Sequence, residues 1–557
     1  MSELAPVIIF AYRRPAHLAR TLSALASNRE ASQTHLIVYC DHVPEGANES
    51  AIYQMHLTRT IAHRENRFLS VEVIERTSNH GLAENILQGV TEVTGKFGKA
   101  IVLEDDLLVA PGFLKYMNEA LIRYENENDV ACISGYVYPL HETPSSSFFI
   151  RGADCWGWAT WATKWSLIER DGNRLIKEIE KKNLVSVFDF DSSYPYMNML
   201  LDKIHGRNNS WAILWYASAL INNKLCLYPA KSLVQNIGND GSGTNHQSWT
   251  NSYRISFETA TEFSWPSTIA ESQRGRELFI RFFKGVKQSF ALRLRRKLGR
   301  ILRSFNKDKS NNLWTGDYQS WQEAQSDCTG YDSNNILNQV ASAISKVVKG
   351  EAAYERDGVV FKDFEYSENV LSALLHAFNQ KGQAISVADF GGSLGSLYFQ
   401  YRTLLKGKIE SWNVIEQKHF VDRGKAQFET DILKFYHSLE ELCATKTPDL
   451  LVLSSVICYL EDPYYWVEKF KALGIQCVLL DRTAFIQGES DRLTIQHVPE
   501  SIYPASYPAW FLNEEKLLIS WIIDYDIVAE LPDTIDGENL IDGVVCYRKG
   551  YYFKRKE

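Results

Sequence analysis

Short apolar runs typical of buried strands alternate with helical stretches twice along this chain of 557 residues. The first series has predicted strands at 7–11, 35–40, 70–75 and 100–103, with helices between them at 15–27, 51–63 and 82–94. The second series has predicted strands at 385–390, 412–416, 450–454 and 477–481. Such alternation predicts doubly wound α/β domains, which bind ligands at the carboxyl ends of their strands.

A strongly basic segment separates the two series. Residues 274–309 carry 13 Lys and Arg against two acidic residues, although the whole chain has a net charge of -8. Their apolar residues recur at near-helical spacing, so a basic amphipathic helix is predicted. It either binds an anionic membrane surface or packs as a linker on an acidic neighbour. We expect an α/β domain over residues 1–270, a basic helical linker over 271–313 and a second α/β domain over 314–557.

Targeting signals are not evident in the sequence. The apolar run at residues 7–10 is shorter than a signal peptide requires, and no run approaches the ~20 apolar residues of a membrane-spanning helix. The nine Cys are scattered without a C-x-x-C pair, which favours reduced thiols. We therefore expect a cytoplasmic protein, with peripheral contact at the inner face of the cell membrane through residues 274–309. The acidic net charge argues against binding of nucleic acid by bulk attraction.

Three adjacent carboxylates end the predicted strand at 100–103, namely Glu104, Asp105 and Asp106. Adjacent acids repel one another, and burial strengthens the repulsion, so a cation is expected beside them. Oxygen ligands suit Mg²⁺ or Mn²⁺, and a divalent ion on a diphosphate stabilises a departing nucleotide. The alternative is that these acids only cap the following helix.

Two sequence stretches in this half resemble a known enzyme class. PVIIFAYRRPAHLARTLSAL at the start and EDDLLVAPGFLKYM after the acids resemble GT-A glycosyltransferases of the family-2 kind. The EDD motif with its aromatic helix is also similar to the N-acetylglucosaminyltransferase of N-glycan processing. The resemblance covers residues 5–250 and implies transfer of a sugar from a nucleotide-sugar donor to a saccharide acceptor.

The resemblance also implies roles for single residues. Asp106 would be the direct metal ligand, while Glu104 and Asp105 would orient the nucleotide and the sugar. The residues implied at the donor nucleotide are Tyr12, Arg13, Asp41 and Asn85. For Arg13 and Asp41 the alternatives are a surface charge and a turn residue.

A glycine-rich polar stretch, residues 235–246, follows later in the same half. Its composition predicts a loop able to close over a diphosphate through backbone N–H groups. His246 at its end is the candidate second metal ligand, because a late His completes the metal shell in several GT-A enzymes. The alternative is an ordinary loop histidine.

An inverting transferase needs a general base for the acceptor hydroxyl. The related N-acetylglucosaminyltransferase has an Asp in a W-D-D-W context, but the corresponding stretch here, residues 210–216, contains no carboxylate. We favour Asp154 as the catalytic base because it adjoins the Trp-rich residues 156–161, with Asp202 and Asp240 as alternatives. The Trp rings either stack on sugars or belong to the core.

The second series carries a different ligand signal. The sequence VADFGGSLGS follows a predicted strand and contains Asp389, Gly391, Gly392 and Gly395. Glycines there allow a close backbone approach, and an acid before them suits a ligand with an amino group, such as S-adenosyl-L-methionine. Glu416 ends the next predicted strand, where an acid binds ribose hydroxyls.

Six ordered stretches strengthen this interpretation: GYDSNNIL, VADFGGSLGS, WNVIEQKHFV, LLVLSSVICYLEDP, LLDRTAF and PESIYPASYPAWFL. Together they resemble a bacterial family of class I methyltransferases found beside surface-polysaccharide genes, over residues 314–557. The resemblance implies that Ser454 and Ser455 line the methyl-donor pocket. It implies an acceptor side with Asp481, Arg482, His497 and Tyr507, for each of which an ordinary packed edge is the alternative.

The sequence thus predicts a bifunctional enzyme of surface-glycan synthesis that uses Mn²⁺ or Mg²⁺ and S-adenosyl-L-methionine. It would add a sugar to a saccharide acceptor, lipid-linked in the simplest version, and methylate a glycan hydroxyl. One alternative keeps only one half catalytic and makes the other a binding module. Two others are a nicotinamide-dependent oxidoreductase in the second half and nucleic-acid binding through the basic segment.

Overall fold

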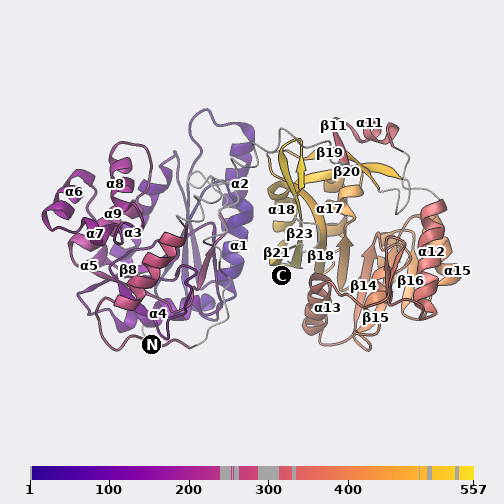
Figure 1. Ribbon diagram of the computed structural model, residues 1–557, viewed down its shortest axis with the longest axis horizontal. Coiled ribbons are helices and arrows are strands. Elements are labelled where there is room, and N and C mark those ends of the chain that lie inside the picture. Colours follow the sequence, from indigo (N-terminus) through magenta and orange to yellow (C-terminus); the bar gives the residue numbers. More distant parts are fainter. Residues whose placement is uncertain are drawn as a thin grey trace. The chain divides into compact units, whose positions relative to one another are not determined.

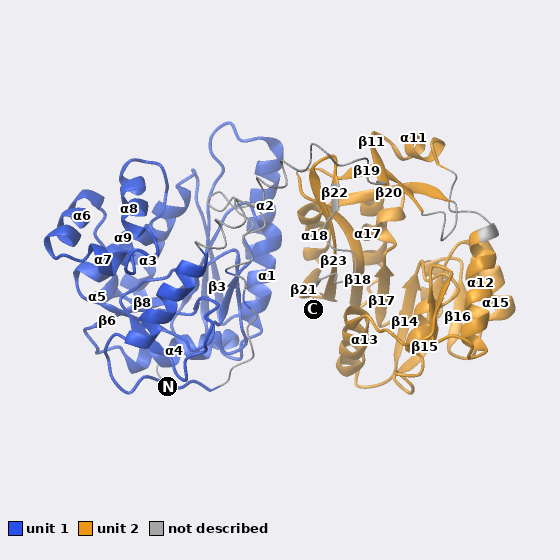
Figure 2. Cartoon of the chain, viewed as in Figure 1, with its two compact units in different colours: residues 1–306 blue, residues 307–557 orange. Residues whose placement is uncertain are grey.

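A computed structural model describes residues 3–238, 253, 255, 262–286, 313–328, 334–488, 490–498, 505–532 and 539–556. The chain forms two compact units, Met1–Asn306 and Lys307–Glu557 (Figure 2). Each unit is built on its own large sheet, with helices between most of its strands. The predicted fold class of two α/β domains is therefore confirmed.

An eight-stranded sheet forms the centre of the N-terminal unit (Figure 1). Its spatial order is β3 (Ser70–Glu75), β2 (His35–Cys40), β1 (Val7–Ala11), β4 (Lys99–Glu104), β8 (Trp158–Trp161), β6 (Val130–Ser134), β9 (Leu225–Tyr228) and β7 (Phe148–Ile150). The first four strands are parallel, whereas β8 is antiparallel to both of its neighbours. The residues that follow β1, β2 and β4 therefore gather at one edge of the sheet.

Helices connect these strands, and several begin or end at residues that favour a helix terminus. α1 (Pro15–Ala26) begins with a proline, α2 (Glu49–Arg64) is capped by the Asn48 side chain, and α3 (Gly81–Phe97) ends at left-handed Gly98. The other helices of the unit are α4 (Phe113–Arg123), α5 (Ala162–Trp165), α6 (Gly172–Lys181), α7 (Val185–Phe188), α8 (Tyr196–Ile204) and α9 (Ala212–Ile221). A short pair, β5 (Leu107–Val109) with β10 (Val234–Asn236), follows the acids of β4.

The first part of the predicted linker packs on the N-terminal unit. Residues 273–286 are helical, and Leu278, Phe279, Phe282 and Phe283 on this helix are buried. Tyr138 contacts the last three with ring centroids 5.0 Å apart in each case. The apolar face of this stretch is therefore covered and is not available to a membrane surface, while residues 287–312 lie outside the described part.

Across the described ranges, no helix combines the length and the apolar character that spanning a bilayer would require.

The C-terminal unit has a sheet with one strand of opposite direction inserted near its edge. Its spatial order is β16 (Leu433–Tyr436), β15 (Ile409–Ile415), β14 (Ile385–Phe390), β17 (Leu450–Ser454), β18 (Cys477–Ile486), β23 (Val544–Arg555) and β21 (Tyr525–Pro532). All these strands are parallel except β23, which is antiparallel to β18 and β21. Because β14, β15 and β17 are parallel neighbours, the residues that follow them lie at one edge of the sheet, where such sheets bind ligands.

Smaller elements extend this unit around the sheet. β18 continues past the end of β17 and pairs with β20 (Ser506–Asn513), which leads to β19 (Arg492–His497) and β11 (Trp314–Tyr318). A hairpin of β12 (Tyr354–Arg356) and β13 (Val359–Phe361) precedes the main sheet, and β22 (Asn539–Ile541) pairs with β23. The helices are α11 (Trp321–Ser326), α12 (Asn334–Val348), α13 (Glu368–Lys381), α14 (Ser396–Tyr401), α15 (Lys418–Gln427), α16 (Leu439–Cys443), α17 (Pro463–Ala472) and α18 (Glu514–Ile522).

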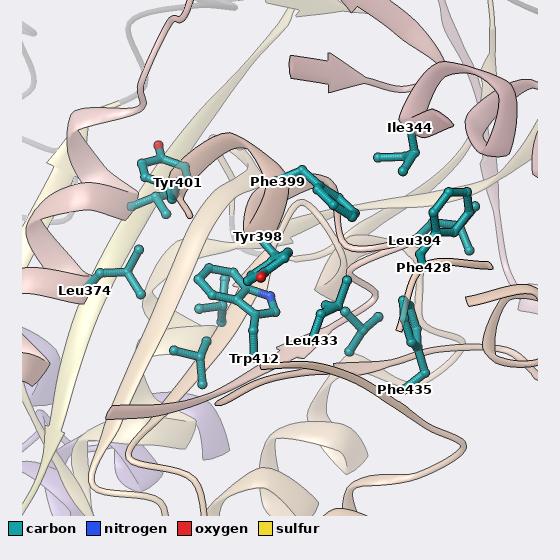
Figure 3. Packing of buried hydrophobic residues seen from close by; sticks show 14 of the residues in the cluster. Ile344, Leu374, Leu394, Tyr398, Phe399, Tyr401, Trp412, Phe428, Leu433 and Phe435 are labelled. Carbon is teal, nitrogen blue, oxygen red and sulfur yellow. The ribbon is translucent and has the colours of Figure 1, made fainter. Parts of the chain in front are cut away.

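The main core of the C-terminal unit lies directly beneath its glycine loop. Trp412 of β15 is buried beside Tyr398 of α14, with ring centroids 6.2 Å apart (Figure 3). Leu433 of β16 packs within the same cluster and lies under Gly395, where an added Cβ would approach it to 3.1 Å. This packing fixes the positions of the loop and of α14 relative to the strands.

Candidate active sites

The three carboxylates lie at the carboxyl end of β4, next to the end of β1. Phe10 is paired with Glu104, so the residues after each strand adjoin one another. Asp105 and Asp106 are 2% and 7% exposed. The backbone N–H of Tyr12 donates a 2.9 Å hydrogen bond to Asp105 Oδ2, which ties the two strand ends together.

The positive charge beside the acids is supplied by Arg14. Its Nη1 donates to Asp106 Oδ2 over 2.9 Å, and its Nη2 is hydrogen-bonded to Asp105 Oδ1. Burial raises the pKa of Glu104, and repulsion from Asp106 adds to this effect. Burial also raises the pKa of Asp105, although Arg14 opposes it. The sequence predicted a cation here but not that a side chain of the protein would be one.

Asp106 keeps one carboxylate oxygen without a partner. Its Oδ1 is buried and makes no hydrogen bond in the described part of the chain. A buried anionic oxygen without a partner is costly, so it fits the place of a metal ligand. Within the described residues, however, no three His, Cys, Asp or Glu side chains are grouped so that they could hold an ion. The predicted ligand His246 lies outside the described residues, as does Asp240.

The other residues predicted at the nucleotide lie around the same sheet edge. Arg13 has a left-handed backbone (φ 49°) and places its guanidinium 4.7 Å from the ring centre of Tyr12. The carboxylate of Asp41 accepts backbone N–H groups of His80 and Gly81 at 3.0 and 2.9 Å. Asp41 therefore anchors the start of α3, and its predicted contact with a base or ribose would add to that role.

Asn85 lies inside α3 and is 3% exposed. Its Oδ1 accepts a 2.8 Å hydrogen bond from Nε of Arg76. Arg76 in turn lies 5.0 Å from the ring centre of Tyr39. The predicted contact of Asn85 with the nucleotide stays a prediction.

Asp154 lies at the same edge of the sheet as the acids of β4. Because β8 is antiparallel to β4, with Trp158 opposite Val102, the residues before β8 lie where β4 ends. The hydroxyls of Tyr138 and Tyr228 donate to its two carboxylate oxygens over 2.6 and 2.9 Å. Burial raises the pKa of Asp154, and these hydrogen bonds oppose the shift. A carboxylate with a raised pKa and a fixed orientation is suited to act as a general base.

The Trp-rich stretch divides between the site and the core. Trp156 is half-buried and lies edge-on to Tyr136 at 4.7 Å. Trp158 and Trp161 are buried, and Trp158 packs within 6.1 Å of Trp215. The core interpretation is therefore right for Trp158 and Trp161. Trp215 is fully buried in α9, so the stretch that replaces the W-D-D-W motif is a core helix.

The glycine loop of the second site turns sharply after β14. Gly391 and Gly395 have φ values of 74° and 89°, which favour glycine. An added Cβ at Gly391 would lie 2.6 Å from Val456, so the backbone passes close to the end of β17. Asp389 is 1% exposed and accepts a 2.9 Å hydrogen bond from the Trp412 indole. Burial raises its pKa to about 7, with Trp412 lowering and Glu416 raising it.

An added Cβ at Gly392 would press on the carboxylate of Asp389, so this glycine also permits a close approach. Glu416 follows β15 and lies at the same strand edge, and burial raises its pKa. Its carboxylate accepts the backbone N–H of Gln417 at 2.7 Å. Asp389 and Glu416 therefore lie at neighbouring strand ends beside the loop, and their contacts with the methyl donor stay predictions.

The end of β17 lies beside the middle of β18, with Ser454 paired with Asp481. Ser454 donates a 2.8 Å hydrogen bond to Asp481 Oδ2, and the N–H of Ser455 donates to the Asp481 carbonyl over 2.9 Å. Ser455 and Arg482 have left-handed backbones with φ of 53° and 48°. Ser393 in the glycine loop is also left-handed, with φ of 56°. Strained residues of this kind concentrate at functional sites. Here Ser393 and Ser455 follow the ends of β14 and β17, and Arg482 lies within β18 beside the end of β17.

Two residues predicted on the acceptor side lie on β19 and β20, the strands that extend the sheet beyond β18. His497 is exposed, and its Nε2 is 2.9 Å from Oγ1 of Thr315. Tyr507 lies edge-on to Tyr459 at 5.4 Å, just after β17. Tyr507 thus lies near the predicted donor pocket, whereas His497 lies on the exposed end of its strand.

One contact at the second site was missed by sequence reasoning. Glu355 in the hairpin is 3% exposed, and its carboxylate is hydrogen-bonded to the hydroxyl of Ser396 at the start of α14. It also accepts the Gly358 N–H at 2.9 Å. Burial raises the pKa of Glu355 to about 7. A single charged residue in a three-residue strand carries no local signal for such a role.

Comparison with known proteins gives one match for the N-terminal half. Residues 7–182 match the family described as Glycosyl transferase family 2. This segment runs from β1 through α6 and contains both the β4 acids and Asp154. No curated protein matches the chain.

Several solved methyltransferase structures are similar at low identity. The N-terminal domain of EvdMO1, solved with SAH and D-fucose, is 10% identical, with 40% of this chain and 98% of that chain covered and a TM-score of 0.27. A S-adenosylmethionine-dependent methyltransferase from Clostridium acetobutylicum ATCC 824 is 10% identical, with 40% and 99% covered and a TM-score of 0.24. CalS10, an amino pentose methyltransferase from Micromonospora echinaspora, is 9% identical, with 34% and 92% covered and a TM-score of 0.23.

Proposed function

We propose that the chain is a bifunctional enzyme. Its N-terminal unit would transfer a sugar from a nucleotide-sugar donor to a saccharide acceptor, and its C-terminal unit would methylate a glycan hydroxyl with S-adenosyl-L-methionine. The observation that carries the first activity is the meeting of the β4 acids and Asp154 at one sheet edge. The match of residues 7–182 to a glycosyltransferase family supports it.

In the proposed transfer, Asp154 takes the proton of the acceptor hydroxyl. The hydroxyl oxygen then bonds to the anomeric carbon of the donor sugar, and the bond from that carbon to the diphosphate breaks. Asp106 would hold the divalent ion through its Oδ1, with Glu104 and Asp105 orienting the donor and His246 as a further ligand. Bound Mn²⁺ or Mg²⁺ would neutralise charge on the leaving diphosphate.

The methyltransferase proposal is supported by topology and by the loop together. The strands β16, β15, β14, β17 and β18 are parallel, and the glycine loop lies at their carboxyl edge, where doubly wound sheets bind ligands. Asp389 would bind the amino group of the donor, with Gly391, Gly392 and Gly395 allowing the close approach. Glu416 would bind ribose hydroxyls, and Ser454 and Ser455 would line the pocket.

In the methyl transfer itself, the acceptor oxygen bonds to the methyl carbon while the carbon–sulfur bond breaks and its electron pair stays on sulfur. The acceptor proton leaves to a base or to water. Asp481 is the best-placed candidate base, since it lies beside Ser454 at the end of β17. Alignment of donor and acceptor would supply most of the acceleration.

The proposal also covers the acceptor and the cellular site of action. We infer action on a bacterial surface glycan of the O-antigen or capsule type, with a lipid-linked acceptor, at the cytoplasmic face of the membrane. We place the transferase in residues 1–286, because helical residues 273–286 pack on it, and the methyltransferase in residues 314–557. The second candidate function, with one unit acting only as a binding module, is favoured by the lack of a carboxylate in residues 210–216.

A donor screen tests the proposal. The purified chain is incubated with a panel of nucleotide sugars and Mn²⁺, and slow hydrolysis of one donor is the expected result. Asp106→Ala should abolish this hydrolysis and leave S-adenosyl-L-methionine binding intact. Hydrolysis that persists in Asp106→Ala would refute the metal assignment.

A further inference from the structure

The guanidinium of Arg14 lies on the same carboxylate, that of Asp106, to which the proposed function assigns a divalent ion. It bridges Asp105 and Asp106, and its own side chain is only 18% exposed. A bidentate arginine holds two carboxylates in one geometry better than any other side chain. The acid cluster therefore already has a fixed positive charge of its own.

The surrounding backbone closes over this ion pair. The N–H of Ile237 donates a 2.9 Å hydrogen bond to the carbonyl of Asp106. A Cβ added to Gly238 would collide with Asp106 Oδ2 and would lie 2.9 Å from Arg14 Nη1. The backbone at Gly238 thus lies against the Arg14–Asp106 pair, and Gly238 belongs to residues 235–246, the stretch predicted to close over a diphosphate.

Arg14 provides hydrogen bonds to only some of the carboxylate oxygens in the acid cluster. It contacts Oδ2 of Asp106, whereas Oδ1 of the same buried carboxylate has no partner among the residues that the structure describes. An ion bound at Oδ1 would lie on the same carboxylate as the guanidinium, and two positive charges that close repel strongly in a buried site. The Arg14 bridge and a divalent ion at Asp106 therefore compete for the same carboxylate.

We propose that Arg14 is a built-in counter-ion that the divalent metal must displace, and that the released guanidinium then binds the donor diphosphate. This inference rests on the proposed metal-dependent transfer and adds an exchange step to it. In the ligand-free chain Arg14 pairs with Asp105 and Asp106. With a divalent ion and the donor nucleotide bound, Asp105 and Asp106 would no longer depend on Arg14, and its guanidinium would turn to the donor diphosphate.

Binding of Mn²⁺ alone to the full chain tests the exchange by calorimetry. Arg14→Gln removes the charge but keeps a hydrogen-bond donor, so it should bind Mn²⁺ about tenfold or more tightly than the wild type, because the competing state is gone. Arg14→Lys keeps the positive charge but cannot bridge both carboxylates in the same way. Its Mn²⁺ affinity should lie between those of Arg14→Gln and the wild type. Arg59→Gln removes a different ion pair of the same unit, with Glu75 at 2.8 Å, and should leave Mn²⁺ affinity unchanged.

Two further readouts separate exchange from a merely structural role. Without metal, the melting temperature of Arg14→Gln should lie below that of the wild type. Added Mn²⁺ should raise the melting temperature of the variant by more than it raises that of the wild type. With Mn²⁺ saturating, Arg14→Gln should bind inorganic pyrophosphate more weakly than the wild type. If Arg14→Gln does not fold, tighter Mn²⁺ binding by Arg14→Lys supports the exchange and unchanged binding contradicts it.

The outcomes also distinguish this inference from the proposed function. If the wild type binds Mn²⁺ through Asp106 and Arg14→Gln binds it no more tightly, the exchange is wrong while metal-dependent transfer stands. If neither protein binds Mn²⁺, the metal assignment fails and the exchange fails with it. Loss of binding in Asp106→Asn identifies the site that is being measured.

Discussion

The hydroxyl of Tyr138 donates a 2.6 Å hydrogen bond to Oδ1 of Asp154. Tyr228 donates to the other oxygen, so both oxygens of this carboxylate are held by phenols. Burial raises the pKa of Asp154, and the phenols oppose the shift by stabilising the charged form. The same tyrosine that orients the proposed base therefore also sets how basic it is.

Asp154→Asn should remove the proposed base while keeping the shape of the site. Sugar transfer should fall by about 10²–10⁴-fold, which is the usual contribution of general base catalysis. The affinity for the donor nucleotide should not change, since Asp154 serves the acceptor side. Initial rates and calorimetry on the same preparation would check both expectations. Transfer at the wild-type rate would move the base to another residue.

Tyr138→Phe should shift the pH dependence of the transferase. The base works only when deprotonated, so the rate is lost as the pH falls through the raised pKa of Asp154. Removing the Tyr138 hydrogen bond removes an effect that lowers this pKa, so the acid limb should move to higher pH. Rate profiles of the two proteins would show the displacement. An acid limb that stays in place or moves to lower pH would contradict this account.

Binding of S-adenosyl-L-methionine should weaken on the acid side of neutrality. The proposed contact needs the charged carboxylate of Asp389, whose pKa burial raises to about 7 in the ligand-free chain. Above that pKa the affinity should be constant, and well below it the affinity should fall about tenfold per pH unit. Calorimetry on both sides of pH 7 would measure this. Asp389→Asn is the control and should bind weakly with a flat pH dependence.

Gly391→Ala should destroy donor binding, whereas Gly382→Ala should not. Both glycines are left-handed, with φ of 74° and 72°, so an alanine at either should cost about 1–2 kcal/mol of stability. Only at Gly391 does the new Cβ also clash, 2.6 Å from Val456; at Gly382 it meets nothing within 4 Å. Denaturation and S-adenosyl-L-methionine titration of both variants separate strain from the loss of the site. Equal affinities would mean that the loop does not bind the donor.

Phe279→Ala should destabilise the N-terminal unit, although this residue lies in the predicted linker. Phe279 is 1% exposed and packs on Tyr138 and Tyr228. Loss of a buried phenylalanine costs about 3–5 kcal/mol. Arg281→Ala, an exposed change on the same helix, should stay within about 0.5 kcal/mol of the wild type. Chemical denaturation would compare them, and equal stabilities would mean that the helix does not contribute to this unit.

Much of the two sheets followed from local sequence pattern. The predicted strands at 7–11, 35–40, 70–75, 385–390 and 450–454 coincide with β1, β2, β3, β14 and β17. Buried parallel strands are continuous apolar runs, and their acids or glycines come where each run stops, so both the elements and the strand-end residues were visible.

What was not predictable depends on contacts between distant parts of the chain. The Arg14 bridge spans more than 90 positions, and the Tyr228 hydrogen bond to Asp154 spans 74. A hydrophobic period says nothing about such pairs. The apolar period of residues 273–286 was also correctly seen, but whether that face meets a membrane or a core is decided by the surface presented by Tyr138, Phe190 and Tyr228.

The chain is proposed to hold two independent ligand sites, and a crosswise titration separates them. Wild type, Asp106→Ala and Asp389→Ala are each titrated with S-adenosyl-L-methionine and with Mn²⁺ plus the donor nucleotide found in the screen. Asp106→Ala should lose only the nucleotide, and Asp389→Ala should lose only S-adenosyl-L-methionine. A wild type that fails to bind one of the two ligands, or a variant that loses both while still folded, would contradict the account.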